Sequence, residues 1–444
     1  MKADGLSDLA VETFANYYRR LAAGEQGMLP EDELEPVDEL PDAEELPEPD
    51  SDELLDRAVV LKLNGGLGTS MGMTGPKSLL EVKDGLSFLD ITVRQVLEER
   101  KRSNARLPLV LMHSFATREQ SLKELERYPE LEVDVPLDFV QGKVPKLRAD
   151  DLTPVEWPDN PELEWAPPGH GDLYTSLVAS GMLETLLDHG YEYAFVGNID
   201  NLGAVLEPRI LAWFAREELP FLMETAVRSE ADRKGGHVAR RRGDGLVLRE
   251  TAQTRDEDQD AFQDVNRHRF FNANTIWLNL RKIGEVMEER DGVLGLPMIV
   301  NRKTVDPTDK SSPDVIQLEA AMGAAIDVFD GAAAIEVPRT RFAPVKTTND
   351  LLMLRSDAYL LTNDARVELA PERDSRPPFI DLDSDYFKLV SDFDERFRAG
   401  PPSLVRCERL EVEGDVHFGA DVVVEGSVTV DGPREIEDGT TLRG

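Results

Sequence analysis

The sequence predicts an α/β fold with a mixed, mostly parallel central sheet, followed by a separate β-rich tail. Apolar runs bounded by polar residues recur at 107–114, 192–200, 219–227 and 268–280. Segments with the helical spacing of apolar residues, such as 174–187, lie between these runs. Continuous apolar strands that alternate with helices are typical of a sheet that helices cover on both faces. Ligands bind such folds at the carboxyl ends of the strands, so a functional site is expected at that edge.

The first 56 residues are expected to form one helix and an acidic connection. Residues 6–21 place apolar side chains at helical spacing. Residues 29–56 carry 14 Asp and Glu, no Lys or Arg, and five prolines. Because like charges repel and proline disfavours a helix interior, this stretch is predicted to be a linker that either lies along the surface or is mobile. An acidic arm that binds a partner is the less favoured alternative.

The most informative segment is 59–77, VVLKLNGGLGTSMGMTGPK, in which an apolar run ends in a glycine-rich loop. Glycines let backbone N–H groups approach a polyanion without interference from Cβ atoms. Lys77 adds a fixed positive charge at the end of the loop. The spacing matches neither GxxxxGK[ST], because Pro76 precedes the lysine, nor GxGxxG. A strand before the loop and helical spacing after it favour a nucleoside triphosphate site over a connecting turn.

The tail, residues 402–444, contains short β-rich pieces separated by Gly and Asp turns. Short strands at a short repeat predict a β-solenoid, with a small β-meander or hairpin as the alternative. The length allows only a few coils, so the tail is expected to pack against the main domain or another subunit. The chain is therefore divided into an N-terminal helix and acidic linker (1–56), an α/β domain (57–360) and a β-rich domain (361–444).

Composition narrows the class of protein. A chain of 444 residues with 41% hydrophobic and 31% charged residues fits a globular enzyme of one to three domains. The single cysteine, Cys407, excludes an intramolecular disulfide and argues against a cysteine-rich zinc site. No signal peptide or long apolar stretch is found, so a cytoplasmic protein with no membrane segment is expected. The net charge of −37 argues against nucleic acid or anionic lipid as partners; salt adaptation and GC-rich coding both remain open as its origin.

Segment 62–82, KLNGGLGTSMGMTGPKSLLEV, closely resembles the nucleotide loop of the eukaryotic-type UTP–glucose-1-phosphate uridylyltransferases, also called UDP-glucose pyrophosphorylases. Further segments resemble that family in the same order: FVQGKVPKL (139–147), WAPPGHGDLYTSL (165–177), FVGNIDNLGA (195–204), KGGH (234–237), FFNANTIWL (270–278), VIQLEAAMGAAI (315–326) and VPRTRFAPVKTTNDLL (337–352). The resemblance covers essentially the whole chain. It implies a Rossmann-like nucleotidyltransferase domain followed by a left-handed β-helix.

The resemblance implies UTP and glucose 1-phosphate as substrates. A phosphate oxygen of glucose 1-phosphate would attack the α-phosphorus of UTP, which would release pyrophosphate and form UDP-glucose. Because two phosphate-bearing substrates repel each other, such a site needs cations. The resemblance assigns this role to the catalytic lysines Lys77 and Lys346 and to Mg²⁺ held by Asp200. One carboxylate makes a weak metal site, so the metal is expected to arrive with the nucleotide.

The resemblance also assigns binding residues. For UTP these are Leu63, Asn64, Gly65, Gly66, Lys77, Gln141, Gly169, Asn198, Asp200 and Lys346. For the sugar phosphate they are His170, Gly236, Glu250, Asn272 and Asn274. The amide of Gln141 both donates and accepts, so it can read a pyrimidine edge. Simple turn roles are the alternative for Asn272 and Asn274, and an acid–base role for His170 is not favoured.

Two features depart from the family pattern. The chain ends at Gly444, earlier than the animal and fungal members, whose β-helices join subunits, so a monomer or dimer is expected. The arginines at 240–242 have no assigned place. Two other functions stay open. The loop NGGLGTS disfavours a transferase for N-acetylhexosamine phosphate or another sugar, and retention of Lys77, Asp200 and Lys346 disfavours a nucleotide sensor without catalysis.

Overall fold

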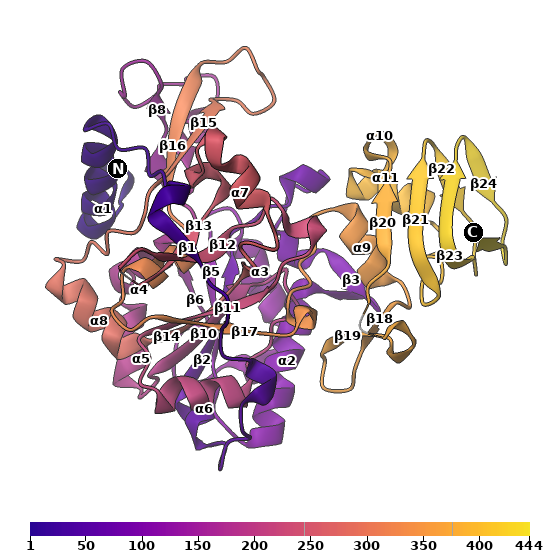
Figure 1. Cartoon of the computed structure of the whole chain (residues 1–444), viewed down its shortest axis with the longest axis horizontal. Helices are drawn as coiled ribbons and strands as arrows, with labels where there is room; N and C mark the ends of the chain where they lie inside the picture. The colour runs from indigo at the N-terminus through magenta and orange to yellow at the C-terminus, as the bar shows by residue number, and fades with distance from the viewer. Residues whose placement is uncertain (244, 375) are drawn as a thin grey trace.

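A computed structural model of the chain describes residues 1–243, 245–374 and 376–444, and its centre is a ten-stranded mixed sheet (Figure 1). The strands β6, β5, β2 and β10 run parallel to one another in that order. β14 is antiparallel to both β10 and β11, and β11 is parallel to β17. These strands are β2 (Ala58–Asn64), β5 (Leu109–His113), β6 (Asp138–Val140), β10 (Tyr193–Asn198), β11 (Phe221–Val227), β14 (Phe270–Asn279) and β17 (Ala333–Glu336). The predicted α/β class with a mostly parallel sheet is confirmed.

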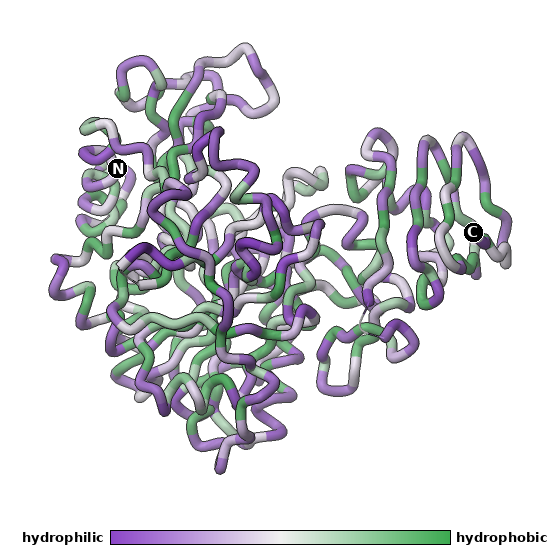
Figure 2. The backbone as a smooth tube through the Cα atoms, in the orientation of Figure 1, coloured by the Kyte–Doolittle hydropathy of each residue, from purple (hydrophilic) through white to green (hydrophobic). Residues whose placement is uncertain are grey.

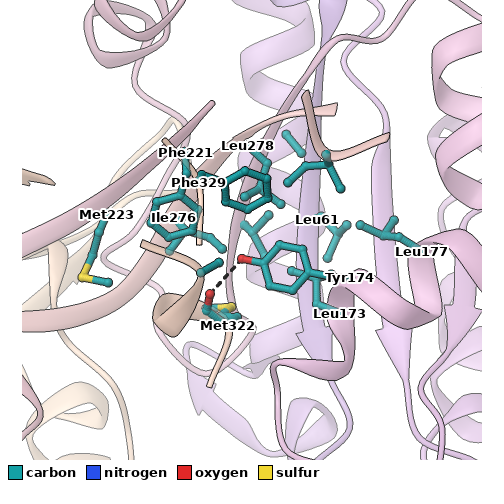
Figure 3. Packing of buried hydrophobic residues seen from close by; sticks show 14 of the residues in the cluster. Leu61, Leu173, Tyr174, Leu177, Phe221, Met223, Ile276, Leu278, Met322 and Phe329 are labelled. Carbon is teal, nitrogen blue, oxygen red and sulfur yellow. Dashed lines mark hydrogen bonds between the residues drawn. The ribbon is translucent and has the colours of Figure 1, made fainter. Parts of the chain in front are cut away.

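Helices cover both faces of this sheet because successive side chains of each strand point to opposite faces. Val60 of β2 packs with α2 and α6, whereas Leu61 packs with α4, α5 and α8. Figure 3 shows this second face, where the hydroxyl of Tyr174 donates to the carbonyl of Met322 at 2.8 Å. The helices are α1 (Asp8–Ala22), α2 (Phe88–Ser103), α3 (Arg118–Leu125), α4 (Asp172–Ala179), α5 (Met182–Asp188), α6 (Pro208–Arg216), α7 (Gln259–Gln263), α8 (Leu280–Glu289), α9 (Thr348–Arg355), α10 (Ser384–Phe387) and α11 (Val390–Arg396).

The helical spacing over 174–187 corresponds to two helices, α4 and α5, rather than to one continuous helix. Gly181 lies between them with φ of 75°, in the left-handed region that ends a helix. The helical spacing of apolar residues continues across this break, which is why the sequence did not reveal it.

The acidic linker lies along the surface, as one of the two predicted alternatives states. Its strand β1 (Leu34–Pro36) pairs with β12 (His237–Arg241), which continues into β13 (Leu246–Arg249). This pairing also places the arginines at 240–242. Glu35 lies opposite Arg240, and the backbone N–H of Arg242 donates to the Glu33 carbonyl. The predicted helix at 6–21 is confirmed as α1.

The tail is a stack of parallel strands at the end of the molecule far from α1 (Figure 1). One sheet contains β20 (Phe379–Leu382), β21 (Cys407–Glu413), β23 (Val423–Asp431) and β25 (Thr441–Arg443); the other contains β22 (Val416–Phe418) and β24 (Arg434–Ile436). Leu410 pairs with Val428 and Val416 with Arg434, an offset of 18 residues in both cases. The 18-residue repeat begins at β21, because β20 and β21 are offset by 30 residues. Parallel stacking with such a repeat is typical of a solenoid and excludes a β-meander, in which neighbouring strands run antiparallel. The left-handed winding stays a prediction.

Four smaller sheets complete the fold. They are β3 (Glu81–Lys83) with β4 (Leu86–Ser87), β7 (Val144–Pro145) with β9 (Trp165–Ala166), β18 (Tyr359–Leu361) with β19 (Val367–Leu369), and β8 (Leu147–Arg148) with β16 (Asp314–Glu319) and β15 (Ile299–Thr304). Apolar residues follow the central strands, while outer loops are largely hydrophilic (Figure 2). Among the described residues, no helix is both long and apolar enough to cross a membrane. The predicted domain boundary at 360 lies inside β18, and the division into domains stays a prediction.

Candidate active site

The glycine-rich loop follows β2 at the carboxyl edge of the sheet. The backbone N–H of Lys77 donates to the Gly66 carbonyl at 2.9 Å and so closes the loop. Gly68 and Gly72 have φ of 64° and 76°, a region in which side chains with a Cβ are strained. The loop is therefore compact, and it returns Lys77 to the end of the strand from which the loop began.

Lys77 meets Asp200 at this edge. Because β2 and β10 are parallel neighbours, Asn198 and Asp200 arrive beside the glycine loop. The Nζ atom of Lys77 lies 2.5 Å from Oδ2 of Asp200, and the two side chains are 16% and 20% exposed. This half-buried contact brings the predicted catalytic cation to the predicted metal ligand.

The surroundings of Asp200 fit a Mg²⁺ ion that is only partly held by protein. Lys77 donates a hydrogen bond to one carboxylate oxygen of Asp200, so the second oxygen is a candidate metal ligand. No group of three or more His, Cys, Asp or Glu side chains suited to hold a metal occurs in the described part of the chain. Mg²⁺ commonly takes one or two carboxylates and completes its shell with phosphate oxygens and water, so a single carboxylate is a sufficient protein contribution.

The segment that carries Lys346 is fastened to the same turn. The side chain of Asn201 accepts a hydrogen bond from the Ala343 N–H at 2.9 Å and donates to the Arg341 carbonyl at 3.1 Å. Because Asn201 directly follows Asp200, these bonds hold the segment that precedes Lys346 beside the turn that carries Asp200. Asn201 had no predicted role, since its sequence signal is only that of a turn residue.

A buried ion pair holds the segment that carries Lys346 to the central sheet. Arg341 donates from Nε to Oε2 of Glu224 at 2.8 Å and from Nη2 to Oε1 at 2.6 Å. Glu224 is fully buried, and Arg341 is nearly so. Removing one member of such a pair leaves an uncompensated charge in the interior, so the pair holds the segment firmly once the chain is folded. No sequence pattern pairs these two residues, which are far apart along the chain.

Gln141 lies against the glycine loop. A Cβ atom added to Gly65 would lie only 3.1 Å from Nε2 of Gln141, so the glycine admits the amide. The backbone N–H of Gln141 donates to the His113 carbonyl at 2.7 Å. Leu63 and Asn64 are buried beneath the loop, and the Asn64 amide donates to its neighbours there rather than outward. Of these predicted residues, Gln141, Gly65 and Gly66 therefore offer the accessible groups.

Asp172 joins the Gln141 segment to the turn at 168–171 and was not predicted. Its Oδ2 accepts a hydrogen bond from the Gly142 N–H at 2.6 Å and another from the Ser176 hydroxyl at 2.6 Å. Its own N–H donates to the Gly169 carbonyl at 3.2 Å. Burial raises the pKa of Asp172 to about 6, against the opposing effect of these hydrogen bonds. The sequence shows only an acidic residue at a helix start, which is the usual reason for such a residue.

His170 is placed to donate a hydrogen bond from its outer nitrogen. The Met322 N–H donates to Nδ1 of His170 at 3.0 Å. Burial lowers the pKa of His170 to about 4, so the ring is neutral near pH 7 and its proton is assigned to Nε2. Gly169 beside it has φ of 81°, and a Cβ there would lie 2.5 Å from the Ala320 carbonyl oxygen. A neutral donor fits hydrogen bonding to a ligand better than acid–base chemistry.

Four of the five residues predicted to bind the sugar phosphate, all except His170, form one group. The Gly236 carbonyl accepts a hydrogen bond from the Asn272 N–H at 2.9 Å, and Oδ1 of Asn272 accepts one from the Asn274 N–H at 2.8 Å. A Cβ on Gly236 would lie 2.5 Å from Oε2 of Glu250. Burial raises the pKa of Glu250, and the positive charge of Lys346 opposes that shift. The group therefore lies near the second lysine, as transfer to a sugar phosphate would require.

Comparison with known proteins agrees with this geometry. The model of the family described as UTP–glucose-1-phosphate uridylyltransferase matches residues 11–425. The chain is similar to the protein of that name from Solanum tuberosum, with 42% identity over 397 residues, 88% of this chain and 81% of the relative. It is also similar to the one from Hordeum vulgare, with 40% identity over 394 residues, again 88% and 81%.

Solved structures give the same result. The chain is 44% identical to the UDP-glucose pyrophosphorylase from Leishmania major solved in open and closed forms, with a TM-score of 0.94 over 100% of this chain and 96% of that one. A UDP-glucose phosphorylase from Trypanosoma brucei gives 45% identity and a TM-score of 0.90, over 100% and 98%. A variant of the Leishmania major protein was solved in complex with UDP-glucose.

Proposed function

This chain belongs to the UTP–glucose-1-phosphate uridylyltransferase family, and on that premise we propose that it transfers UMP from UTP to glucose 1-phosphate. The products are UDP-glucose and pyrophosphate. The observation that supports this most strongly is the meeting of Lys77 and Asp200 at 2.5 Å, beside the segment of Lys346. That arrangement places a lysine beside a candidate Mg²⁺ ligand, and these are the two kinds of group that a phosphate-bearing substrate pair would need.

Each part of the site has a role in this proposal. The glycine loop and Gln141 bind the uridine end of UTP, and His170 donates to a phosphate or to the sugar. Lys77 and Lys346 stabilise the negative charge that develops at the α-phosphorus and on the leaving pyrophosphate. Glu250, Asn272 and Asn274 bind the sugar hydroxyls through carboxylate and amide groups. Direct displacement needs no covalent intermediate with the protein, so positioning and charge account for catalysis.

Asp200 would hold Mg²⁺ together with phosphate oxygens of the nucleotide. When bound, this ion supplies charge neutralisation across the phosphates. The proposal also includes the left-handed winding of the tail, the domain division at 56 and 360, a cytoplasmic location and a monomer or dimer.

Pyrophosphate release from UTP and Mg²⁺ tests the proposed function directly. The three acceptors to compare are glucose 1-phosphate, N-acetylglucosamine 1-phosphate and galactose 1-phosphate, each at low and at molar salt. Release with glucose 1-phosphate, abolished by EDTA and restored by Mg²⁺, is the expected result. Preference for another acceptor would show that glucose 1-phosphate is not the substrate. No pyrophosphate release under any condition would favour a nucleotide sensor without catalysis.

A further inference from the structure

A cavity of about 370 Å³ lies on the α2 face of the sheet and does not include any of the predicted substrate residues. Its buried part is mainly apolar and comes from β2, β10, α2 and the segment after Asp200, whereas its more exposed part carries charged side chains of α2 and of the loop at 364–366. The lining residues that matter here are Val60, Lys62, Val96, Leu107, Phe195 and Leu206. A cavity of this size with an apolar buried part and one buried charged group has the general character of a small-molecule site.

Lys62 is the one charged side chain deep in this cavity, and the transfer proposed above does not use it. The residue is 3% exposed, and its Nζ donates to the Ala204 carbonyl at 2.9 Å and lies 5.0 Å from the centre of the Phe195 ring. Within the described residues, no carboxylate oxygen lies within 4.0 Å of this nitrogen. An ammonium has three N–H donors, so the single carbonyl leaves donors for another acceptor.

The setting of Lys62 is costly for a cation without a close anion. Burial, together with the positive charge of Arg341, lowers the pKa of Lys62 to about 7, although Glu224 and Asp200 act in the opposite direction. A ligand carboxylate next to Nζ would supply the missing anion in a water-poor site, where such a pair is stronger than in solvent.

We propose that this cavity is a second ligand site, which binds a small molecule with an apolar body and a single carboxylate. The apolar body would contact Val60, Val96 and Phe195, and the carboxylate would accept hydrogen bonds from Lys62. The cations at the rim are already paired, since Arg102 lies 2.6 Å from Glu99, Lys101 lies 3.3 Å from Glu98 and Arg366 lies 3.1 Å from Asp364. One unpaired cation at the base therefore favours a monoanion over a phosphate-bearing ligand.

Calorimetric titration of the full chain with 4-phenylbutyrate, without substrates, tests the proposal independently of catalysis. The neutral 4-phenylbutyramide has the same apolar body and serves as the matched probe. We expect saturable one-to-one binding of the carboxylate and about tenfold weaker binding of the amide, since the ion pair with Lys62 would be absent. Absence of binding, or equal affinity for the two compounds, would overturn the proposal.

Two variants locate the bound probe. Lys62→Met keeps the length of the side chain and removes the charge, and it should weaken only the carboxylate, by about tenfold. Gln95→Trp, at a half-buried position in the lining, should block binding of both probes. If Lys62→Met does not fold, this variant alone shows whether the probe binds in the cavity. Lys310→Met, at an exposed position, should bind both probes as the wild type does. Unchanged binding in Gln95→Trp, or displacement of the probe by UTP, would place the ligand elsewhere and contradict the proposal.

Discussion

Lys77 and Lys346 are the two cations of the proposed mechanism, and each should be needed for turnover. Lys77→Ala and Lys346→Ala should each lower kcat by about 100-fold or more, because a fixed charge at the developing transition state is lost. The unfolding midpoint should move by only about 2 °C, since neither side chain belongs to the buried core. Steady-state pyrophosphate release measures the effect, with the exposed Lys310→Ala as control. Wild-type turnover in either variant would contradict the two-lysine mechanism.

Asp172 should make the stability of the chain depend on pH in a defined direction. Its folded-state pKa of about 6 lies above the ordinary value of 3.8, so the folded chain binds this proton more tightly. The contribution to the free energy of unfolding is therefore fully present below pH 3.8 and is lost as the pH rises through 6. Between pH 7 and pH 5 the wild type should gain about 1 kcal/mol that Asp172→Asn does not gain.

Urea unfolding of both proteins at the two pH values measures this difference. Asp385→Asn, at an exposed position in α10, should follow the wild type. An equal change with pH in the wild type and in Asp172→Asn would show that the buried carboxyl does not titrate in this range.

Asp172→Asn should also raise KM for UTP more than it lowers kcat, since Asp172 accepts a hydrogen bond from the Gly142 N–H, next to Gln141.

At the scale of elements, the turn at 168–171 joins α4 to the segment of Ala320, and Gly169 makes this possible. In Gly169→Ala the new Cβ would lie 2.5 Å from the Ala320 carbonyl oxygen, and the alanine would have to adopt a φ of 81°. Gly190→Ala is the matched control, because its φ is 87° but nothing lies within 4 Å of its Cβ. The control should lose about 1 kcal/mol of stability, the effect of the backbone alone.

Gly169→Ala should lose more stability than this control and should also lose affinity for UTP. The turn must shift to relieve the contact, and His170 and Asp172 would shift with it. Thermal unfolding and KM for UTP measure the two effects. Equal behaviour of the two variants would show that the close approach to Ala320 has no consequence.

Elements were predictable where periodicity alone determines them, and were missed where a single backbone angle does. The parallel strands and α1 follow from apolar spacing, whereas the break between α4 and α5 depends on the left-handed Gly181. The site divides in the same way. Lys77 and Asp200 follow strands that end at one edge, so their meeting could be anticipated. Arg341 and Glu224 pair across a large sequence separation, and nothing local in either segment indicates the other.

Across the whole molecule, individual acidic side chains are paired with basic ones, although the net charge is strongly negative. Glu31, in the stretch without any basic residue, pairs with Arg249 and Arg267 of the main sheet region. The arginines at 240–242 had no place in the sequence because their neighbours are distant along the chain: Glu35 of β1 lies opposite Arg240, and Arg241 lies 3.2 Å from Asp327. Long-range charge pairing of this kind leaves no periodic signal, so it becomes visible only in the folded chain.

The tail and the glycine loop share one hydrophobic core, and this should make them unfold together. Met71 of the loop and Val82 of β3 belong to the same buried cluster as Phe387 and Phe393 of the tail region. Phe387 is fully buried, so Phe387→Ala should cost about 3–5 kcal/mol. Because the core is shared, the variant should show one unfolding transition at a lower temperature, rather than early loss of the tail alone.

Differential scanning calorimetry measures this coupling, and transferase activity is measured in parallel over the same range of temperature. Phe379→Ala is the matched control, since that ring is 48% exposed and its removal should cost less than about 1 kcal/mol. Activity should be lost at the same lowered temperature in Phe387→Ala, because the glycine loop, the proposed nucleotide site, rests on the core that the substitution opens. Two separate transitions, with activity surviving the first, would instead show that residues 361–444 fold as an independent domain.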